Sequence, residues 1–164
     1  MTMDGEVRQI NVKSKVPGER GLPKKPMDSV LITGRGVQGD FNVYRHEKLG
    51  DDPDSALLII PIETIRELNS EGWPVKPGDL GENLTTDGIP YGSFAVGKTF
   101  DVGGARFQIS RACNPCDNLF FLPFVGQARG PAFMKAMIGR RGWYARVLKG
   151  GWVRTGDSIT EIPG

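Results

Sequence analysis

Apolar and polar residues alternate in several short stretches of this chain, a pattern typical of β-strands. Residues 6–14 alternate imperfectly and predict one strand, and residues 28–33 predict a second. Residues 55–61 are nearly all apolar, which indicates a short buried strand. Residues 80–86 are expected to begin or line a further strand. The chain therefore reads as a series of short strands.

Two later regions combine apolar runs with paired glycines, which is a hairpin signal. Residues 93–112 predict a strand, a turn at the glycine pair 103–104 and a second strand. Residues 143–162 repeat the pattern, with the glycine pair 150–151 at the turn and a second turn at 155–157. We expect a hairpin in each region.

Helical periodicity is clearest over residues 61–72, where Pro61 suits the first turn and Gly72 suits the end. Residues 130–139 predict a second, shorter helix bounded by glycines. Strands and helices do not alternate regularly, which argues against a doubly wound α/β fold. We expect residues 1–164 to form one mainly β, barrel-like domain with a few short helices.

Composition narrows the classes of function without selecting one. The chain has 164 residues, is 38% hydrophobic and carries a formal net charge of +2, which is ordinary for a globular protein and gives no reason to expect nucleic-acid binding. No apolar run approaches the roughly 20 residues that span a bilayer, and the first residues do not resemble a signal peptide. We expect a cytoplasmic protein with reduced thiols and no membrane partner.

The candidate chemistry begins at RACNPCDNLF (111–120), which holds both cysteines of the chain, Cys113 and Cys116. A thiol redox pair is one interpretation, although the βαβ pattern expected around such a pair is missing. Structural zinc needs four ligands, and only one histidine, His46, is available to add to the thiols. Burial as two inert thiols is the plain alternative.

A single functional Cys116 is the remaining interpretation. Pro115 fixes the backbone just before it, and Arg111 supplies a nearby cation, which would favour the thiolate. A thiolate is both a nucleophile and a soft metal ligand.

The sequence resembles the MOSC domain family, named for the C-terminal domain of molybdenum cofactor sulfurases, from about residue 12 to residue 162. Several segments carry the resemblance together, in the family's order and spacing: GVQGD (36–40), PDSALLI (53–59), PGDLGENLTTDGI (77–89), NPCDNL (114–119) and RRGWYARVLKGGWVRTGD (140–157).

The resemblance implies a barrel-rich fold and a cysteine that carries sulfur or coordinates molybdenum in a pterin cofactor, molybdopterin. Cys116 matches that cysteine, so it is our candidate catalytic residue and metal ligand, and Cys113 inherits no role. Within the matched segments, Glu82 and Asn83 are candidates for the pterin's polar edge or for orienting the cysteine loop.

Basic residues supply candidates for the cofactor's phosphate. Arg140 and Arg141 carry permanently charged, forked donors suited to it, and Lys24 and Lys25 in the turn-rich loop of residues 16–26 are further candidates. The same loop carries Arg20. A pair of solvated arginines is the plain alternative.

One loop departs from the family pattern. Many members carry a His-His-Gly-Gly run before the Pro-Asp-x-Ala segment, whereas this chain reads RHEKLGDDPDSA (45–56). His46 matches the first histidine, but the second histidine and the glycine pair are missing. An acid–base role for His46 is therefore weighed against that of an ordinary surface histidine.

The first functional hypothesis is a protein that binds the molybdenum cofactor or carries sulfur. The resemblance implies reduction of N-hydroxylated small molecules with electrons from a separate partner protein, or transfer from a sulfur donor. Two cysteines are too few for an iron–sulfur cluster of its own. The alternatives are a non-enzymatic module that binds an anionic ligand or a partner, and a Cys113–Cys116 thiol redox protein.

Overall fold

The computed structural model describes residues 2–19, 21–41, 45–46 and 49–164. Its main feature is a closed barrel of seven strands, which confirms the expected mainly β, barrel-like fold. The order around the barrel is β11, β7, β8, β9, β5, β6 and β1, and β11 pairs with β1 to close it. These strands span β1 Asp4–Val12, β5 Leu57–Pro61, β6 Leu84–Asp87, β7 Thr99–Val102, β8 Ala105–Ala112, β9 Trp143–Lys149 and β11 Ser158–Ile162.

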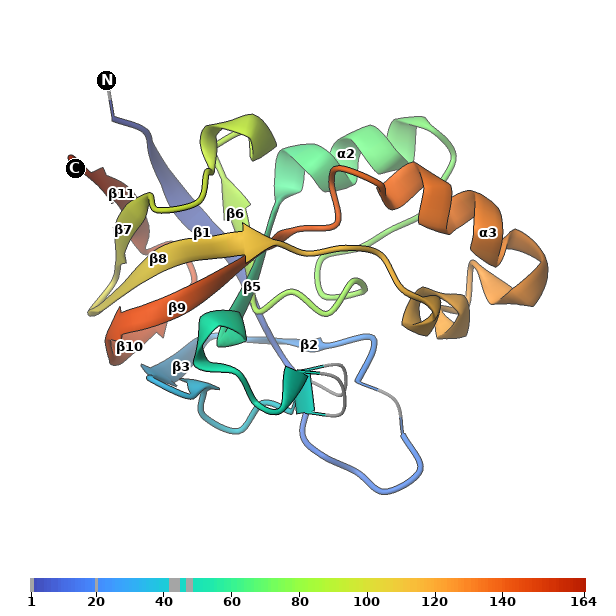
Figure 1. The fold of residues 1–164 in the computed structure, drawn as a ribbon, viewed down its shortest axis with the longest axis horizontal. Coiled ribbons are helices and arrows are strands. Elements are labelled where there is room, and N and C mark those ends of the chain that lie inside the picture. Colours follow the sequence, from blue (N-terminus) through green and yellow to red (C-terminus); the bar gives the residue numbers. More distant parts are fainter. Residues whose placement is uncertain (1, 20, 42–44, 47–48) are drawn as a thin grey trace.

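Register within the barrel brings distant segments together. β5 runs parallel to β6, with Ile59 opposite Leu84, and antiparallel to β9, with Leu58 opposite Tyr144. β8 and β9 are antiparallel, so the end of β8 lies beside the start of β9. The segments after β8 and before β9 therefore lie together beside the end of the short central strand β5, whereas the segment before β6 lies beside its start (Figure 1).

The predicted hairpin at residues 103–104 is confirmed by the pairing of β7 with β8. The predicted hairpin at 150–151 is wrong, because β9 stays in the barrel while β10 (Gly151–Arg154) pairs with β3 (Ser29–Thr33). β3 also pairs with β4 (Gly36–Val37), and β2 (Lys25–Met27) adds to β1. A Cβ on Gly151 would lie 2.2 Å from the carbonyl oxygen of Gly104, so glycine is needed for close backbone approach.

Two helices lie on one side of the barrel (Figure 1): α2 (Ile62–Ser70) and α3 (Gly126–Met137). The first matches its prediction closely. The second begins before residue 130, where the sequence predicted its start, and Gly130 lies inside it. A Cβ on Gly130 would come within 2.5 Å of the Phe120 ring, so this glycine lets an aromatic side chain pack against the helix rather than ending it.

Two apolar clusters hold these parts together. One fills the barrel and includes Ile10, Phe100 and Phe107. The other joins α2 to α3 and to the 3₁₀-helix before α3, through Leu68, Leu119 and Phe133. Burial of each such side chain contributes about 1.5–3 kcal/mol. The loops contain short 3₁₀-helices at Pro53–Ser55, Tyr91–Ser93 and Asp117–Phe121.

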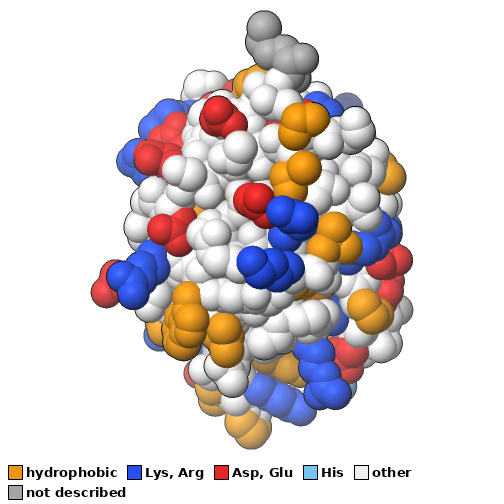
Figure 2. Space-filling model, turned by 90° about the vertical axis from the view of Figure 1, so that its left-hand side faces the viewer, with side chains coloured by type: hydrophobic (Ala, Val, Ile, Leu, Met, Phe, Trp, Pro, Cys, Tyr) orange, Lys and Arg blue, Asp and Glu red, His pale blue; other side chains and the backbone are white. Residues whose placement is uncertain are grey.

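The surface carries charges of both signs. On the described part of the face in Figure 2, basic and acidic side chains are interspersed. Across the described residues, no helix combines the length and apolar character that a membrane span requires.

Candidate functional site

The loop before β6 is built around Asn83. Its backbone N–H donates to the carbonyl of Leu58 at 2.8 Å, and its side-chain oxygen accepts the N–H of Leu58 at 3.1 Å. Its carbonyl accepts the N–H of Asn11 at 2.8 Å. Gly81, at φ +83°, turns the chain just before these contacts. Asn83 therefore joins the loop to β5 and β1 from a fully buried position.

Glu82 is buried beside it, with 0% of its surface exposed. Its Oε2 accepts a hydrogen bond from the Thr85 hydroxyl at 3.0 Å, and Thr85 in turn accepts one from Asn11. Its Oε1 is buried and has no hydrogen-bond partner within the described part of the chain. Burial raises the pKa of the Glu82 carboxyl to about 7, and the nearby backbone N–H groups of Gly78 and Glu82, the Thr85 hydroxyl and the charge of Arg141 oppose this change.

Arg141, between α3 and β9, is the second unusual group. Only 5% of its surface is exposed, and its Nε and Nη1 atoms are buried without a hydrogen-bond partner among the residues that the structure describes. Its charge lowers the pKa of Glu82, yet the ion pairs within 4 Å found among the described residues do not include this pair. A buried guanidinium with free donors is costly unless an anion satisfies it.

A third buried charge lies on the other side of Asn83. The ammonium of Lys24 is paired with Asp40, and the Asn83 amide donates to the same carboxylate at 2.8 Å. Burial lowers the pKa of Lys24, and the charges of Asp40 and Glu82 oppose that change. Lys24 is therefore committed to the site's interior, whereas Lys25 is exposed on β2. No local pattern predicts the pairing of Asp40, which lies in the glycine-rich loop.

Arg140 does not join this cluster. Its guanidinium forms ion pairs with Glu71 and Glu67 of α2 and donates to the carbonyl of Ala136 at 2.7 Å. The Glu71 contact raises the pKa of Arg140. Of the two neighbouring arginines, the structure brings only Arg141 to Glu82.

The two cysteines differ in exposure. Both are free thiols; Cys113 is buried and packs with Leu58 and Tyr144, and Cys116 is partly exposed. The N–H of Cys113 donates to the carbonyl of Gly142 at 2.8 Å, which ties the cysteine loop to the residue after Arg141. Cys116 precedes the 3₁₀-helix of Asp117–Phe121 with an extended backbone. Exposure makes Cys116 the better placed of the two for chemistry.

Tyr91 completes this part of the site. Its hydroxyl donates to the carbonyl of Gly142 at 3.0 Å and accepts the N–H of the same residue at 3.1 Å. Burial raises the pKa of Tyr91, and Cys113 and Arg141 are close enough to contribute. The sequence reasoning missed Tyr91, because a lone tyrosine in a turn carries no motif.

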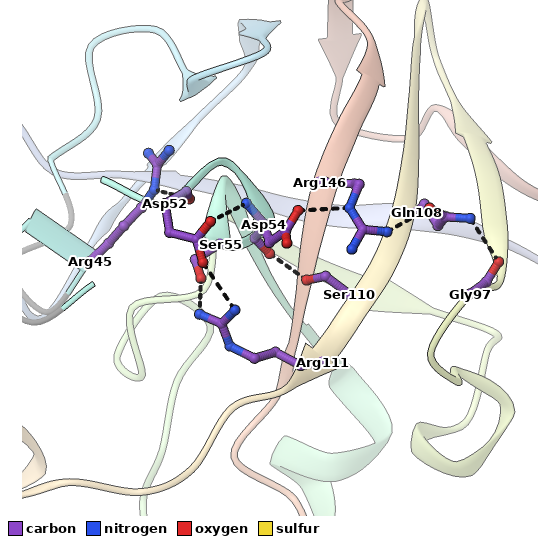
Figure 3. Close-up of polar contacts among 9 residues, drawn as sticks. All are labelled: Arg45, Asp52, Asp54, Ser55, Gly97, Gln108, Ser110, Arg111 and Arg146. Atoms are coloured by element: carbon purple, nitrogen blue, oxygen red, sulfur yellow. Dashed lines mark hydrogen bonds and ion pairs between the residues drawn. The ribbon is translucent and has the colours of Figure 1, made fainter. Parts of the chain in front are cut away.

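Arg111, predicted as a cation near Cys116, has other partners (Figure 3). Its guanidinium bonds to Asp52 at 3.1 Å and to the Ser55 hydroxyl, and it lies 5.1 Å from the centre of the Tyr144 ring. Arg146 bonds to Asp54 at 2.8 Å in the same segment. These contacts from β8 and β9 fix the segment before β5, where the chain departs from the family's histidine and glycine run.

His46 lies in that departing segment, half-exposed, with its Nδ1 atom 3.0 Å from Asp51. It is not among the contacts of Glu82, Asn83 or Arg141. Arg20 lies outside the described residues.

The model of the MOSC domain family matches residues 45–160 of this chain. The chain belongs to the MOSC domain family. Among curated proteins, YiiM of Escherichia coli K12 is 28% identical over 137 residues, which cover 81% of this chain and 58% of YiiM. The MOSC match spans most of the segments described above, and the chain spans less than two thirds of that relative.

Solved structures share the fold. YuaD from Bacillus subtilis has a TM-score of 0.81 at 21% identity, covering 98% of this chain and 97% of YuaD. YiiM from Geobacillus stearothermophilus has a TM-score of 0.73 at 26% identity, covering 97% of this chain and 75% of that protein. The likeness to YuaD shows the MOSC fold alone.

Proposed function

We propose that this MOSC protein binds a molybdenum pterin cofactor and, with a separate electron donor, reduces small N-hydroxylated substrates. The observation that carries the proposal is the buried Arg141, whose Nε and Nη1 donors have no partner among the described residues. Free, buried, charge-bearing donors are what a phosphate group of such a cofactor would satisfy.

The residues around Arg141 fit the same ligand. Oε1 of Glu82 is a second buried atom without a partner, and it suits an N–H donor at the edge of a pterin ring. Both polar atoms of the Asn83 side chain already have a protein partner, Leu58 for the oxygen and Asp40 for the nitrogen. We therefore assign Glu82 to ligand contact and Asn83 to positioning the loop.

Cys116 is the proposed metal ligand. The described residues contain no group of three or more His, Cys, Asp or Glu side chains arranged to hold a metal ion. A single thiolate would therefore complete a coordination sphere that the pterin mainly supplies, and soft sulfur suits that place. The same exposed thiol is the candidate sulfur carrier if the protein transfers sulfur instead.

The bound cofactor would supply two-electron oxidation and reduction chemistry. The chain's own residues would bind and orient it: Arg141 would neutralise the phosphate, and Glu82 would hold or release a proton near neutral pH. Electrons would come from a partner protein.

Metal content tests the proposal directly. Protein made in a host that synthesises the cofactor is analysed for molybdenum and for released pterin. We expect both in the parent, loss of molybdenum in Cys116→Ser, and loss of pterin in Arg141→Met. Arg140→Gln is the matched control and should keep both, because Arg140 is paired with α2.

Full molybdenum in Cys116→Ser would overturn the role of the thiolate. If the parent contains pterin but no metal, and Cys116→Ala keeps the pterin, the result would favour the non-enzymatic binding module instead. A cofactor-loaded protein that fails to reduce an N-hydroxylated purine or amidine with a chemical reductant would refute the proposed reaction.

A further inference from the structure

A separate cavity of about 370 Å³ opens between the loop after β1 and the segment around His46. Its lining includes Lys13, Lys15, Glu19, Phe41 and His46. The volume lies within the usual range for small-molecule sites, about 300–1,000 Å³. The residues assigned above to the pterin and the metal do not line it.

Asp51 holds His46 in one orientation. Gly50 and Asp51 both have left-handed backbone angles, φ +58° and +57°, and the N–H of Asp52 donates to the carbonyl of Leu49 at 3.1 Å. This tight turn brings the Asp51 carboxylate to 3.0 Å from Nδ1 of His46. A carboxylate can only accept, so Nδ1 donates to Asp51. When the ring is protonated, Nε2 carries a second N–H that can donate to an anion.

Phe41 lies next to both basic groups. The His46 ring centre is 5.2 Å from the Phe41 ring centre, and the Lys15 ammonium is 5.0 Å from it. The N–H of Phe41 donates to the carbonyl of Lys13 at 2.8 Å, which fixes the backbone of Phe41 to the opposite wall. An aromatic surface and two nitrogen groups therefore share one side of the cavity.

Within the described residues, the basic groups of the cavity differ in their pairing. The Lys13 ammonium is paired with Glu19. The ion pairs among the described residues do not include Lys15. Nε2 of His46 likewise has no hydrogen bond to the described part of the chain. The cavity thus offers an ammonium and an imidazole nitrogen beside an apolar ring.

We propose that this cavity binds a small aromatic anion, with its ring beside Phe41 and its phosphate or carboxylate accepting hydrogen bonds from the Lys15 ammonium and from the Nε2–H of protonated His46. Asp51 is a positioning residue that acts through His46. The proposal does not depend on molybdenum or on Cys116, because the cavity is lined by other residues.

The single histidine of the chain makes the test direct, since its ring nitrogens give the only imidazole signals in a ¹⁵N spectrum. Metal-free protein is titrated with phenyl phosphate, benzoate and inorganic phosphate. We expect a saturable change at Nε2 with phenyl phosphate or benzoate, and weaker binding of inorganic phosphate because it lacks a ring. Whichever aromatic probe binds more tightly identifies the preferred anion.

Variants separate a built site from general attraction. Lys15→Gln should weaken binding of the tighter aromatic probe about tenfold, as expected for loss of one charged hydrogen bond. Asp51→Asn should also weaken binding of that probe, because the His46 ring then loses the carboxylate that accepts from Nδ1. Asparagine tolerates the left-handed backbone of this turn. Lys25→Gln, a change of an exposed lysine on β2, should leave binding unchanged.

Absence of any saturable change at Nε2 would overturn the proposal. Equal losses in Lys15→Gln and Lys25→Gln would overturn it as well, because they would mean an adventitious ion only. Neither result would affect the molybdenum and pterin measurements, so the two proposals fail separately.

Discussion

Asn83 and Leu58 are joined by two hydrogen bonds, one through the backbone of Asn83 and one through its side chain, at 2.8 and 3.1 Å. The pair holds the loop before β6 against the central strand β5. This contact explains why an asparagine stands next to Glu82 in the middle of the candidate site.

Replacing Asn83 by Ala should destabilise the protein by about 2–3 kcal/mol, because the buried N–H of Leu58 loses its acceptor. Urea unfolding of the metal-free protein measures the change. Asn114→Ala, in an exposed position, is the control and should shift the free energy of unfolding by no more than about 0.5 kcal/mol. Similar effects of the two changes would contradict the structural role of Asn83.

Stability should fall as the pH rises from about 4.5 to about 7. Over that range the folded protein keeps a proton on Glu82, whose pKa is raised to about 7, while the unfolded chain has released it. The folded state binds more protons, so raising the pH favours unfolding, by up to about 3 kcal/mol for this one buried group.

Glu82→Gln should remove that part of the pH dependence and make the protein more stable than the parent at pH 8. Chemical unfolding at several pH values between 4 and 8 gives both curves. Glu6→Gln, an exposed change, should leave the curve unaltered. Parallel curves for the parent and Glu82→Gln would show that Glu82 titrates as it does in the unfolded chain.

Arg141→Met should not destabilise the metal-free protein at pH 5.5, and a gain of about 1–3 kcal/mol is expected. A buried guanidinium with two unpartnered donors costs free energy that an apolar side chain of similar length does not. The low pH keeps Glu82 protonated, so that loss of its neighbouring cation has little effect. Strong destabilisation would mean that Arg141 is satisfied without a ligand.

The two thiols should react at different rates. Cys116 is partly exposed and Cys113 is buried against Leu58 and Tyr144, so a thiol reagent should label one cysteine rapidly in the folded protein and both in urea. Mass spectrometry identifies the labelled residue, and Cys116→Ser should abolish the rapid phase. Rapid labelling of Cys113 would reverse the assignment.

Local patterns in the sequence were enough to predict the class of fold and the loops that carry the candidate site residues. Alternating apolar residues and a glycine pair at 103–104 specify strands and a hairpin through local chemistry, and the spaced motifs indicated the MOSC family. Local patterns also explain the errors. Glycines at 130 and 151 look like boundaries or turns, but they allow close contacts with Phe120 and Gly104, which belong to other elements of the fold.

Which charged groups come into contact depends on long-range packing that appears only in the folded structure. Arg140 and Arg141 are equivalent in the sequence, yet one pairs with Glu71 at the surface and the other is buried beside Glu82. Likewise, nothing local indicates that Asp40 pairs with Lys24, or that the turn at Gly50 brings Asp51 to His46. Burial and pairing depend on the closure of the barrel and on the packing of its loops, and neither is encoded by any single segment.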